Sequence, residues 1–418
     1  MRESKIRTAF LAAIVSISVL SAAIPLARAA DMAPGRADLL SLAQGAMPVA
    51  LGGEATALRV GFDQALLAID GDDGGFGATP RPGGPDTRID FVYSLPAETT
   101  FEEFGVPNVL ETPSPAQTFF RRIEVAGSVA RVEGPFDLLG EATLATHAER
   151  GEMTRIAAIV KKPVRWIRVR LEGGIDVRAE KTFFEFSEIR GYGAQAAVPL
   201  SEGFHGQWKG RGVSLELKQD GARVTGCYDG DGRLRGTVSG SVLHALGEST
   251  RTGVGSAFVL ALGERGEIGG VRSTNGAPFR LYGGEPVEST PTACNVQAVE
   301  PLGCGAIVHG LHFDYDSATL RPESEPILAA LQEGLTQSSE ERVFVVGHTS
   351  SEGSDAYNLD LSKRRARAVV DALVARGLER TRLEADGRGE TQPIADERTD
   401  AGRSLNRRVE IECRGAEG

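Results

Sequence analysis

Aromatic side chains are scarce in this chain, at 6% of its 418 residues, and tryptophan occurs only twice. Glycine, in contrast, supplies 52 residues. Few large side chains and many glycines favour turn-rich β structure over long helices in at least part of the chain. Because 418 residues exceed what one ordinary core accommodates, we expect two to four domains, on the order of 100 to 200 residues each.

Positive charge and catalytic signatures are also lacking. The formal net charge is −11 at pH 7, which argues against non-specific binding to nucleic acid or to an anionic membrane face. The six histidines form no HExxH motif, and the sequence has neither a serine nucleophile elbow nor a glycine-rich phosphate loop. We therefore expect a protein that is not an enzyme, with no catalytic residues, no metal, no cofactor and no nucleic-acid partner.

Long apolar runs are absent after the first thirty residues. Within those thirty, Arg2, Lys5 and Arg7 precede an apolar run over residues 9–26, and Ala27-Arg28-Ala29 follows it. The pattern predicts that residues 1–29 are a bacterial-type secretory signal peptide, removed after about Ala29. An uncleaved membrane anchor is the alternative. The segment carries four basic residues and one acidic residue, so its removal takes the net charge from −11 to −14.

Cysteine is rare too, with four in the chain. An even number of cysteines in an exported protein predicts disulfides, here two. Three pairings are open; we favour Cys304 with Cys413, which bracket the last predicted domain, and this leaves Cys227 with Cys294. No CxxC or Cys/His spacing indicates zinc.

Composition along the chain predicts three folded domains. The clearest boundary is a Pro-, Thr- and Ser-rich linker over residues 285–303, and a softer one lies near residues 191–201. The predicted fold class is multidomain: an all-β jelly-roll-like sandwich over 35–195, a small antiparallel β meander or barrel over 201–284, and an α/β domain over 304–418.

The first predicted domain has alternating segments at Arg88–Tyr93 and Trp166–Leu171, separated by Gly, Pro and Asp clusters. Three motifs occur in order: IDGD at 69–72, VRWIRV at 164–169 and FEFSEIRGYG at 184–193. Through them the domain resembles the discoidin, or coagulation-factor C-type, galactose-binding-like jelly roll. The resemblance implies loops that bind sugars or membrane surfaces.

An acidic cluster lies in this first domain, formed by Asp70, Asp72 and Asp73. It is either a calcium site or a solvated turn. We favour the turn, because the cluster lacks the downstream glutamate of an EF-hand loop.

The second predicted domain alternates strictly, with Val213, Leu215 and Leu217 at every second position before a Gln219-Asp220-Gly221 turn. It resembles the lipocalin-like β units found beside envelope-binding domains. Since large apolar residues are few, we favour a core filled by side chains over a ligand cavity.

The third predicted domain changes character. Strands are expected over 306–314, 342–348, 382–386 and 407–413, and helices over 323–335 and 361–377. This gives the order βαβαββ, a mixed sheet with helices against it.

A basic run on the second of these helices places Lys or Arg at four of the five positions 363–367. At about 100° per residue, Arg364 lies opposite the apolar face and Arg365 on its flank. We expect a solvated face for Lys363, Arg364 and Arg367. Arg365 must meet a carboxylate or point into a cleft, where its planar guanidinium suits a ligand carboxylate.

Several separated motifs in the third domain occur in the order of a known family. They are Phe313-Asp314-Tyr315-Asp316, Gly347-His348-Thr349, Tyr357-Asn358, Leu361-Ser362-Lys363-Arg364-Arg365-Ala366 and Gly402-Arg403-Ser404-Leu405-Asn406-Arg407-Arg408-Val409-Glu410. Through them, residues 307–411 resemble the OmpA-like peptidoglycan-binding domain of the OmpA, MotB and Pal type. The resemblance implies peptidoglycan as a partner and a location in the periplasm of a Gram-negative bacterium, peripheral to the outer membrane or cell wall.

Two positions in the family's signature decide the expected ligand contacts. The arginine that holds the carboxylate of diaminopimelate in the peptidoglycan stem peptide falls on Arg365. The aspartate that pairs with the ligand's ammonium falls on Ser350, which supplies no charge. Replacing a charged hydrogen bond by a neutral one weakens binding by about 1 to 2 kcal/mol, or roughly tenfold.

Three interpretations of Ser350 remain open. A nearby acidic side chain supplies the missing charge, the domain binds a different stem peptide or another ligand, or it has kept the fold and lost affinity. We favour retained but altered binding, because Asn358, Leu361 and Arg365 keep the family's spacing. The predicted peptidoglycan-binding residues are Phe313, Asp314, Thr349, Ser350, Asn358, Leu361 and Arg365, and the candidate charge substitutes are Glu352, Asp355 and Asp314.

The function expected from the sequence is therefore a non-covalent tether. The cell-envelope protein would bind peptidoglycan through its last domain and present two β domains to a glycan or protein of the envelope. The alternative is a carbohydrate-binding adhesin or sensor whose OmpA-like domain has weakened or altered ligand binding.

Overall fold

The computed structural model describes residues 37–72, 76–78, 88–107, 117–144, 153–173, 183–288, 299, 301–314, 316–338 and 342–414. The predicted signal peptide, Asp73 and Cys294 lie outside these residues. Among the helices in these ranges, none is both long and apolar enough to cross a membrane.

Strand β3 (Arg88–Pro107) organises the N-terminal β region, which we define as residues 37–195. It pairs antiparallel with four neighbouring strands: β1 (Met47–Gly53), β7 (Met153–Ala157), β8 and β10 (Arg190–Gln195). Against β8 (Val164–Glu172), Phe91 lies opposite Val169 and Tyr93 opposite Ile167, and all four side chains are buried. The alternating segments at 88–93 and 166–171 are thus paired strands that bury one face, as their pattern predicts.

The remaining elements of this region are short, and its described part is mainly β. They are η1 (Leu42–Gln44), β1 (Met47–Gly53), α1 (Phe62–Leu67), β2 (Phe76–Ala78), β4 (Gln117–Phe119), β5 (Arg122–Ser128), β6 (Asp137–Thr143), β7 (Met153–Ala157), β9 (Phe183–Phe186) and β10 (Arg190–Gln195). They build, with β3 and β8, a seven-stranded antiparallel sheet and a three-stranded sheet of β2, β9 and β4. The discoidin likeness stays a prediction.

The middle β region, residues 206–287, is a nine-stranded antiparallel sheet in which each strand from β11 to β17 pairs with the next. Its strands are β11 (Gly206–Gly210), β12 (Val213–Asp220), β13 (Arg223–Tyr228), β14 (Gly232–Ser239), β15 (Val242–Ser249), β16 (Gly255–Leu262), β17 (Ile268–Thr274), β18 (Arg280–Leu281) and β19 (Glu285–Val287). The meander predicted from the alternation is therefore present.

The last segment of the middle β region joins both ends of its sheet. Strand β18 pairs with β17, β19 pairs with β11, and Ile268 bridges to Gly284 between them. Large buried side chains, including Trp208, Tyr228 and Phe258, form one apolar cluster within it. The arrangement agrees with a barrel filled by side chains.

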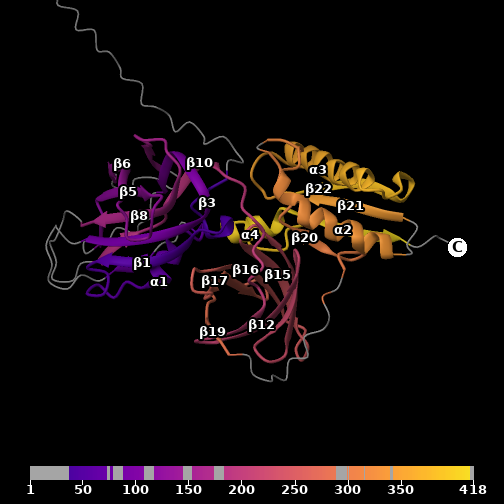
Figure 1. Cartoon of the computed structure of the whole chain (residues 1–418), viewed down its shortest axis with the longest axis horizontal. Coiled ribbons are helices and arrows are strands. Elements are labelled where there is room, and N and C mark those ends of the chain that lie inside the picture. Colours follow the sequence, from indigo (N-terminus) through magenta and orange to yellow (C-terminus); the bar gives the residue numbers. More distant parts are fainter. Residues whose placement is uncertain are drawn as a thin grey trace, which may run out of the picture. The chain divides into compact units, whose positions relative to one another are not determined.

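The C-terminal region, residues 301–414, contains a four-stranded mixed sheet in the order β20-β23-β21-β22. Its elements are β20 (Ile307–His309), η2 (Pro322–Ser324), α2 (Glu325–Gln337), β21 (Arg342–His348), α3 (Asp355–Ala375), η3 (Arg380–Arg382), β22 (Leu383–Gly389), α4 (Asp400–Asn406) and β23 (Arg408–Arg414). Helix α3 packs on β21 and β22 and contacts α2 (Figure 1). Cys304 and Cys413, the favoured pair, form a disulfide. Cys227 is also disulfide-bonded.

Three details of this region differ from the sequence prediction. The order βαβαββ is wrong, because the short helix α4 lies between the last two strands. This helix has little apolar periodicity, and the feature that marks its start is the cap residue Thr399. The Thr399 side chain accepts a hydrogen bond from Gly402 N at 3.1 Å. Helix α3 begins at Asp355 rather than near Leu361, capped by Ser354. The first strand is limited to Ile307–His309, because Gly310 adopts a φ of +80°.

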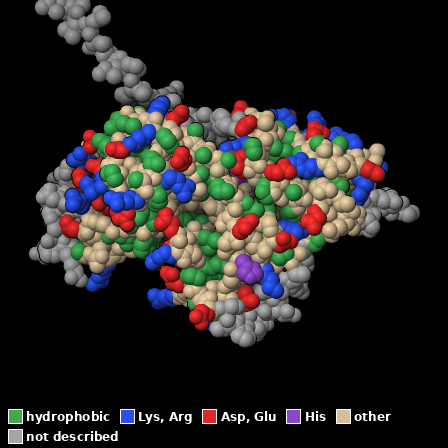
Figure 2. Space-filling model, in the orientation of Figure 1, with side chains coloured by type: hydrophobic (Ala, Val, Ile, Leu, Met, Phe, Trp, Pro, Cys, Tyr) green, Lys and Arg blue, Asp and Glu red, His purple; other side chains and the backbone are tan. Residues whose placement is uncertain are grey.

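Residues 33–418 form one compact unit. The apolar core of the N-terminal β region continues into Val242 and Val259 of the middle β region and into Ala401 and Leu405 of α4. The boundaries of the three predicted domains stay a prediction. On the face drawn in Figure 2, acidic and basic side chains are interspersed.

Candidate functional site

A pocket of about 820 Å³ collects most of the residues that the sequence singles out. It is lined by Phe313, Thr349, Ser350, Glu352, Asn358, Leu361 and Arg365. Asp314 and Asp355 are exposed and are not among the lining residues. Of the candidate charge substitutes, Glu352 alone is therefore placed beside Ser350 in this pocket.

The loop that follows β21 brings Thr349 and Ser350 to the pocket. Thr349 N donates to Gly389 O at 3.0 Å, which fixes the loop to the end of β22. A Cβ on Gly347 would lie 2.4 Å from the carbonyl oxygen of Ser362, so only glycine lets α3 approach β21 this closely. The first half of α3 then supplies Asn358, Leu361 and Arg365.

Arg365 is half-buried and has no ion-pair partner among the described residues. Its Nε donates to Ser317 O at 3.2 Å, and its Cζ lies 4.8 Å from the centre of the Phe313 ring. Burial, and next the positive charge of Arg407, lower the pKa of Arg365 to about 10. The guanidinium therefore stays charged at neutral pH and offers its remaining donors to an anion.

The other members of the basic run behave differently. Lys363 and Arg367 are exposed, and Arg364 forms an ion pair with Asp360 at 2.7 Å, one helical turn away. The expected solvated face is thus present, and Arg365 is the member of the run that lines the pocket.

Ser350 is buried, and its hydroxyl donates to Glu352 Oε2 at 3.2 Å. Glu352 also faces two arginines: Arg407 Nη1 lies 3.4 Å from Oε2, and Arg403 Nε lies 3.9 Å from Oε1. The side chain next to Ser350 is therefore negative, but its charge is shared with two cations.

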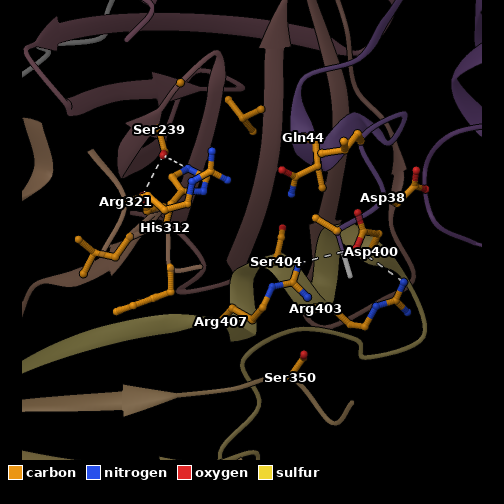
Figure 3. A pocket seen from close by; sticks show the side chains of 18 of the residues that line it. Asp38, Gln44, Ser239, His312, Arg321, Ser350, Asp400, Arg403, Ser404 and Arg407 are labelled. Atoms are coloured by element: carbon orange, nitrogen blue, oxygen red, sulfur yellow. Dashed lines mark hydrogen bonds and ion pairs between the residues drawn. The ribbon is translucent and has the colours of Figure 1, made fainter. Parts of the chain in front are cut away.

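A second carboxylate holds the same two arginines from the other side. Asp400 Oδ1 lies 3.7 Å from both Arg403 Nη2 and Arg407 Nη2, and Asp400 Oδ2 accepts from Ser41 Oγ at 2.7 Å. Burial by itself raises the pKa of Asp400, but Arg407, Arg403 and the Ser41 hydrogen bond together lower it. Figure 3 shows Asp400, Arg403 and Arg407 in the pocket together with Ser350.

Sequence reasoning did not assign a role to Arg403 and Arg407, although both lie in the quoted GRSLNRRVE motif. The spacing of one helical turn between the two arginines could have identified them as a pair, but helix α4 was not predicted. Further pocket residues come from the other two regions and include Asp38, Gln44, Tyr192, Ser239 and His244. Their sequence surroundings give no hint of this pocket.

Asn358 and Tyr357 also have partners. The Asn358 amide donates to Glu390, and the Tyr357 hydroxyl donates to Asp316 Oδ1 at 2.6 Å. These contacts orient the start of α3 against the loops on either side of it. Asn358 thus lines the pocket with its amide nitrogen already donating to Glu390.

Within the ranges that the structure describes, no group of three or more His, Cys, Asp or Glu side chains is arranged to hold a metal. In the predicted acidic turn, Asp72 N donates to Asp70 Oδ1 at 2.9 Å. This hydrogen bond is the side-chain-to-backbone contact typical of a turn.

Part of the pocket lining lies in a segment that matches a known family. Residues 312–407 match the model of the OmpA family. Outer membrane protein A of Bordetella avium is 41% identical over 104 residues, which are 25% of this chain and 54% of that protein. Peptidoglycan-binding protein ArfA of Mycobacterium tuberculosis is 37% identical over 126 residues, 30% of this chain and 37% of that protein.

A solved structure shows similarity over the same share of the chain. The peptidoglycan-associated lipoprotein of Burkholderia pseudomallei is 28% identical, with 25% of this chain and 88% of that chain covered at a TM-score of 0.23. The chain spans about half the length of the Bordetella protein, 54%. Residues 312–407, which supply Phe313, Ser350 and Arg365 to the pocket, are an OmpA family domain.

Proposed function

We propose that this chain is a non-enzymatic protein of the cell envelope that binds peptidoglycan without a covalent bond. The OmpA family domain would hold the stem peptide, and Arg365 would bind the carboxylate of its diaminopimelate. The proposed location is the periplasm, peripheral to the outer membrane or the cell wall.

One observation carries the proposal. The charged guanidinium of Arg365 lines the pocket and has no carboxylate partner in the described chain. A half-buried charge without a counter-ion is unfavourable, so a bound anion relieves it. The planar guanidinium accepts a carboxylate through two parallel hydrogen bonds. Phe313, stacked beside it, holds the plane in place.

Relatives support the choice of ligand by their names. The mycobacterial relative is named a peptidoglycan-binding protein, and its matched segment spans 30% of this chain. The two β regions would then face another envelope partner, a glycan or a protein.

The test is co-sedimentation of the full chain without residues 1–29 with purified diaminopimelate-type sacculi. Arg365→Ala should lower retention roughly tenfold or more, because it removes the charged hydrogen bonds to the ligand. Arg364→Ala is the matched control: it removes a neighbouring guanidinium that is paired with Asp360 and outside the pocket. Equal retention of Arg365→Ala and the parent chain would show that this pocket does not bind the sacculus.

A further inference from the structure

The charge around Ser350 is unsuited to a free amine. Both oxygens of Glu352 are turned toward cations, with Oε2 near Arg407 and Oε1 near Arg403. Asp400 compensates the same two arginines from the opposite side. At this end of the pocket the guanidinium groups of Arg403 and Arg407 thus already face both carboxylates.

The other acidic side chains of the pocket are engaged as well. Asp38 accepts from Leu40 N and Gly191 N, Asp316 accepts from Tyr357, and Glu323 pairs with Arg321. Glu102 also has an interaction partner. Glu352, Asp400 and Glu323 therefore face arginines, and the charge of Asp316 acts on Arg365 and Tyr357.

The hydroxyl oxygen of Ser350 can accept a hydrogen bond from a neutral donor. Its single hydroxyl hydrogen is directed to Glu352, so its lone pairs remain to accept a hydrogen bond. An amide N–H fits that acceptor without bringing charge. An ammonium at the same place would be a third cation beside Arg403 and Arg407, and the positive charges of these two arginines would repel it.

We propose that Ser350 makes the pocket selective for a stem-peptide carboxylate whose neighbouring amino group is acylated, rather than for one with a free ammonium. This rests on the proposed function. An acyl group on that amine is what a peptide cross-link between two stem peptides supplies. The chain would therefore hold cross-linked wall in preference to uncross-linked wall, and Ser350 is the residue that sets this preference.

The experiment compares two soluble probes on the full chain without residues 1–29. One is the tripeptide L-alanyl-γ-D-glutamyl-meso-diaminopimelate with its free side-chain amine, and the other is the same tripeptide N-acetylated at that amine. Isothermal titration calorimetry should show that the acetylated probe binds more tightly, by roughly threefold or more. Ser350→Asp should reverse the order, because its carboxylate pairs with the ammonium.

Glu352→Gln separates this inference from its main competitor. If Glu352 left the arginines to meet the ammonium, the variant would lose affinity for the free amine and keep it for the acetylated probe. On the present proposal Ser350, not Glu352, meets the amino group, so any loss in the variant falls equally on both probes and the ratio of their affinities stays that of the parent chain.

The outcomes distinguish the two proposals. Tighter or equal binding of the free amine by the parent chain overturns the selectivity and leaves peptidoglycan binding intact. Absence of binding of both probes, together with no sedimentation on sacculi, overturns the proposed function itself.

Discussion

Arg365 and His309 are both nitrogen bases that lack an ion-pair partner in the described chain, yet they are in opposite states. Arg365 lines a pocket and keeps its charge, with a pKa lowered by burial to about 10. His309 is buried in the contact between the C-terminal and middle β regions, stacked on His244 at 5.7 Å between ring centres. Burial holds its pKa well below the usual value, so it is neutral.

The two bases differ in how burial acts on their charge. Both ring nitrogens of His309 are buried without a hydrogen-bond partner, which a neutral ring tolerates far better than a charged one. Arg365 remains protonated at any ordinary pH and therefore requires either solvent or an anion. The buried His309 therefore belongs to a packed contact, whereas Arg365, which lines a pocket, is a candidate for binding an anion.

The largest effect should come from placing an ammonium group in the buried histidine contact. His309→Lys should lower the free energy of unfolding by about 3 to 5 kcal/mol, because the ammonium is buried beside His244 without a partner. Chemical denaturation measures this change. His309→Phe, which keeps the ring stack without charge, is the control; similar losses in both would mean that shape rather than charge matters there.

Replacing Arg365, the base that lines the pocket, should change ligand binding rather than stability. Arg365→Met should lower sacculus binding roughly tenfold or more while the free energy of unfolding stays the same or rises slightly, since a half-buried charge is replaced by an apolar chain. Binding is followed by co-sedimentation and stability by denaturation. A large loss of stability would indicate that Arg365 is a structural residue.

Acidification should weaken the histidine contact. Burial lowers the pKa of His244 to about 3 and also lowers that of His309 and His312. In the unfolded chain histidine takes up its proton near pH 6.5, so below that pH the unfolded state binds more protons. The free energy of unfolding therefore falls as pH decreases from about 6.5 toward 3, by up to about 1.4 kcal/mol per pH unit for each histidine.

Two carboxyl groups act against this trend. Burial raises the pKa of Asp38 and of Asp70 to about 7, so between about pH 7 and 4 the folded state binds more protons at these two sites. Denaturation at a series of pH values in parent and His244→Gln should show a shallower decline in the variant. The exposed His205→Gln is the control and should leave the profile unchanged.

The smallest effect is expected on the solvated part of the basic run. Arg364→Ala should lower the free energy of unfolding by at most about 0.5 kcal/mol, because its ion pair with Asp360 is exposed and screened. Sacculus binding should not change. A clear loss of binding would extend the ligand contact beyond the pocket and remove the contrast between Arg364 and Arg365.

Local patterns predicted much of the fold. The alternation at 88–93 and at 213–217 predicts strands, because residues two apart share a face of a sheet, and both segments are strands in the structure. The order of motifs in residues 307–411 predicts the OmpA family domain, which the match over 312–407 confirms. Helix α4 was missed because seven residues with two buried apolar side chains do not show a helical period.

The candidate site was predictable only in part. The spacing within α3 identifies Arg365, because the side of a helix follows from the residue number. The ion pairs of Glu352 with Arg403 and Arg407 cross 51 and 55 residues of chain, and no periodicity connects positions that far apart.

Composition and short-range spacing are enough to predict the β-rich content, the family of the last domain and the distinct position of Arg365 in its basic run. The charge states of the side chains, in contrast, depend on contacts that form only in the folded chain. In the folded chain Glu352 lies against two arginines, His309 is buried against His244, and Ser41 donates a hydrogen bond to Asp400. The physical reason is that solvation and pairing depend on which distant side chains share a space, and folding alone sets that arrangement.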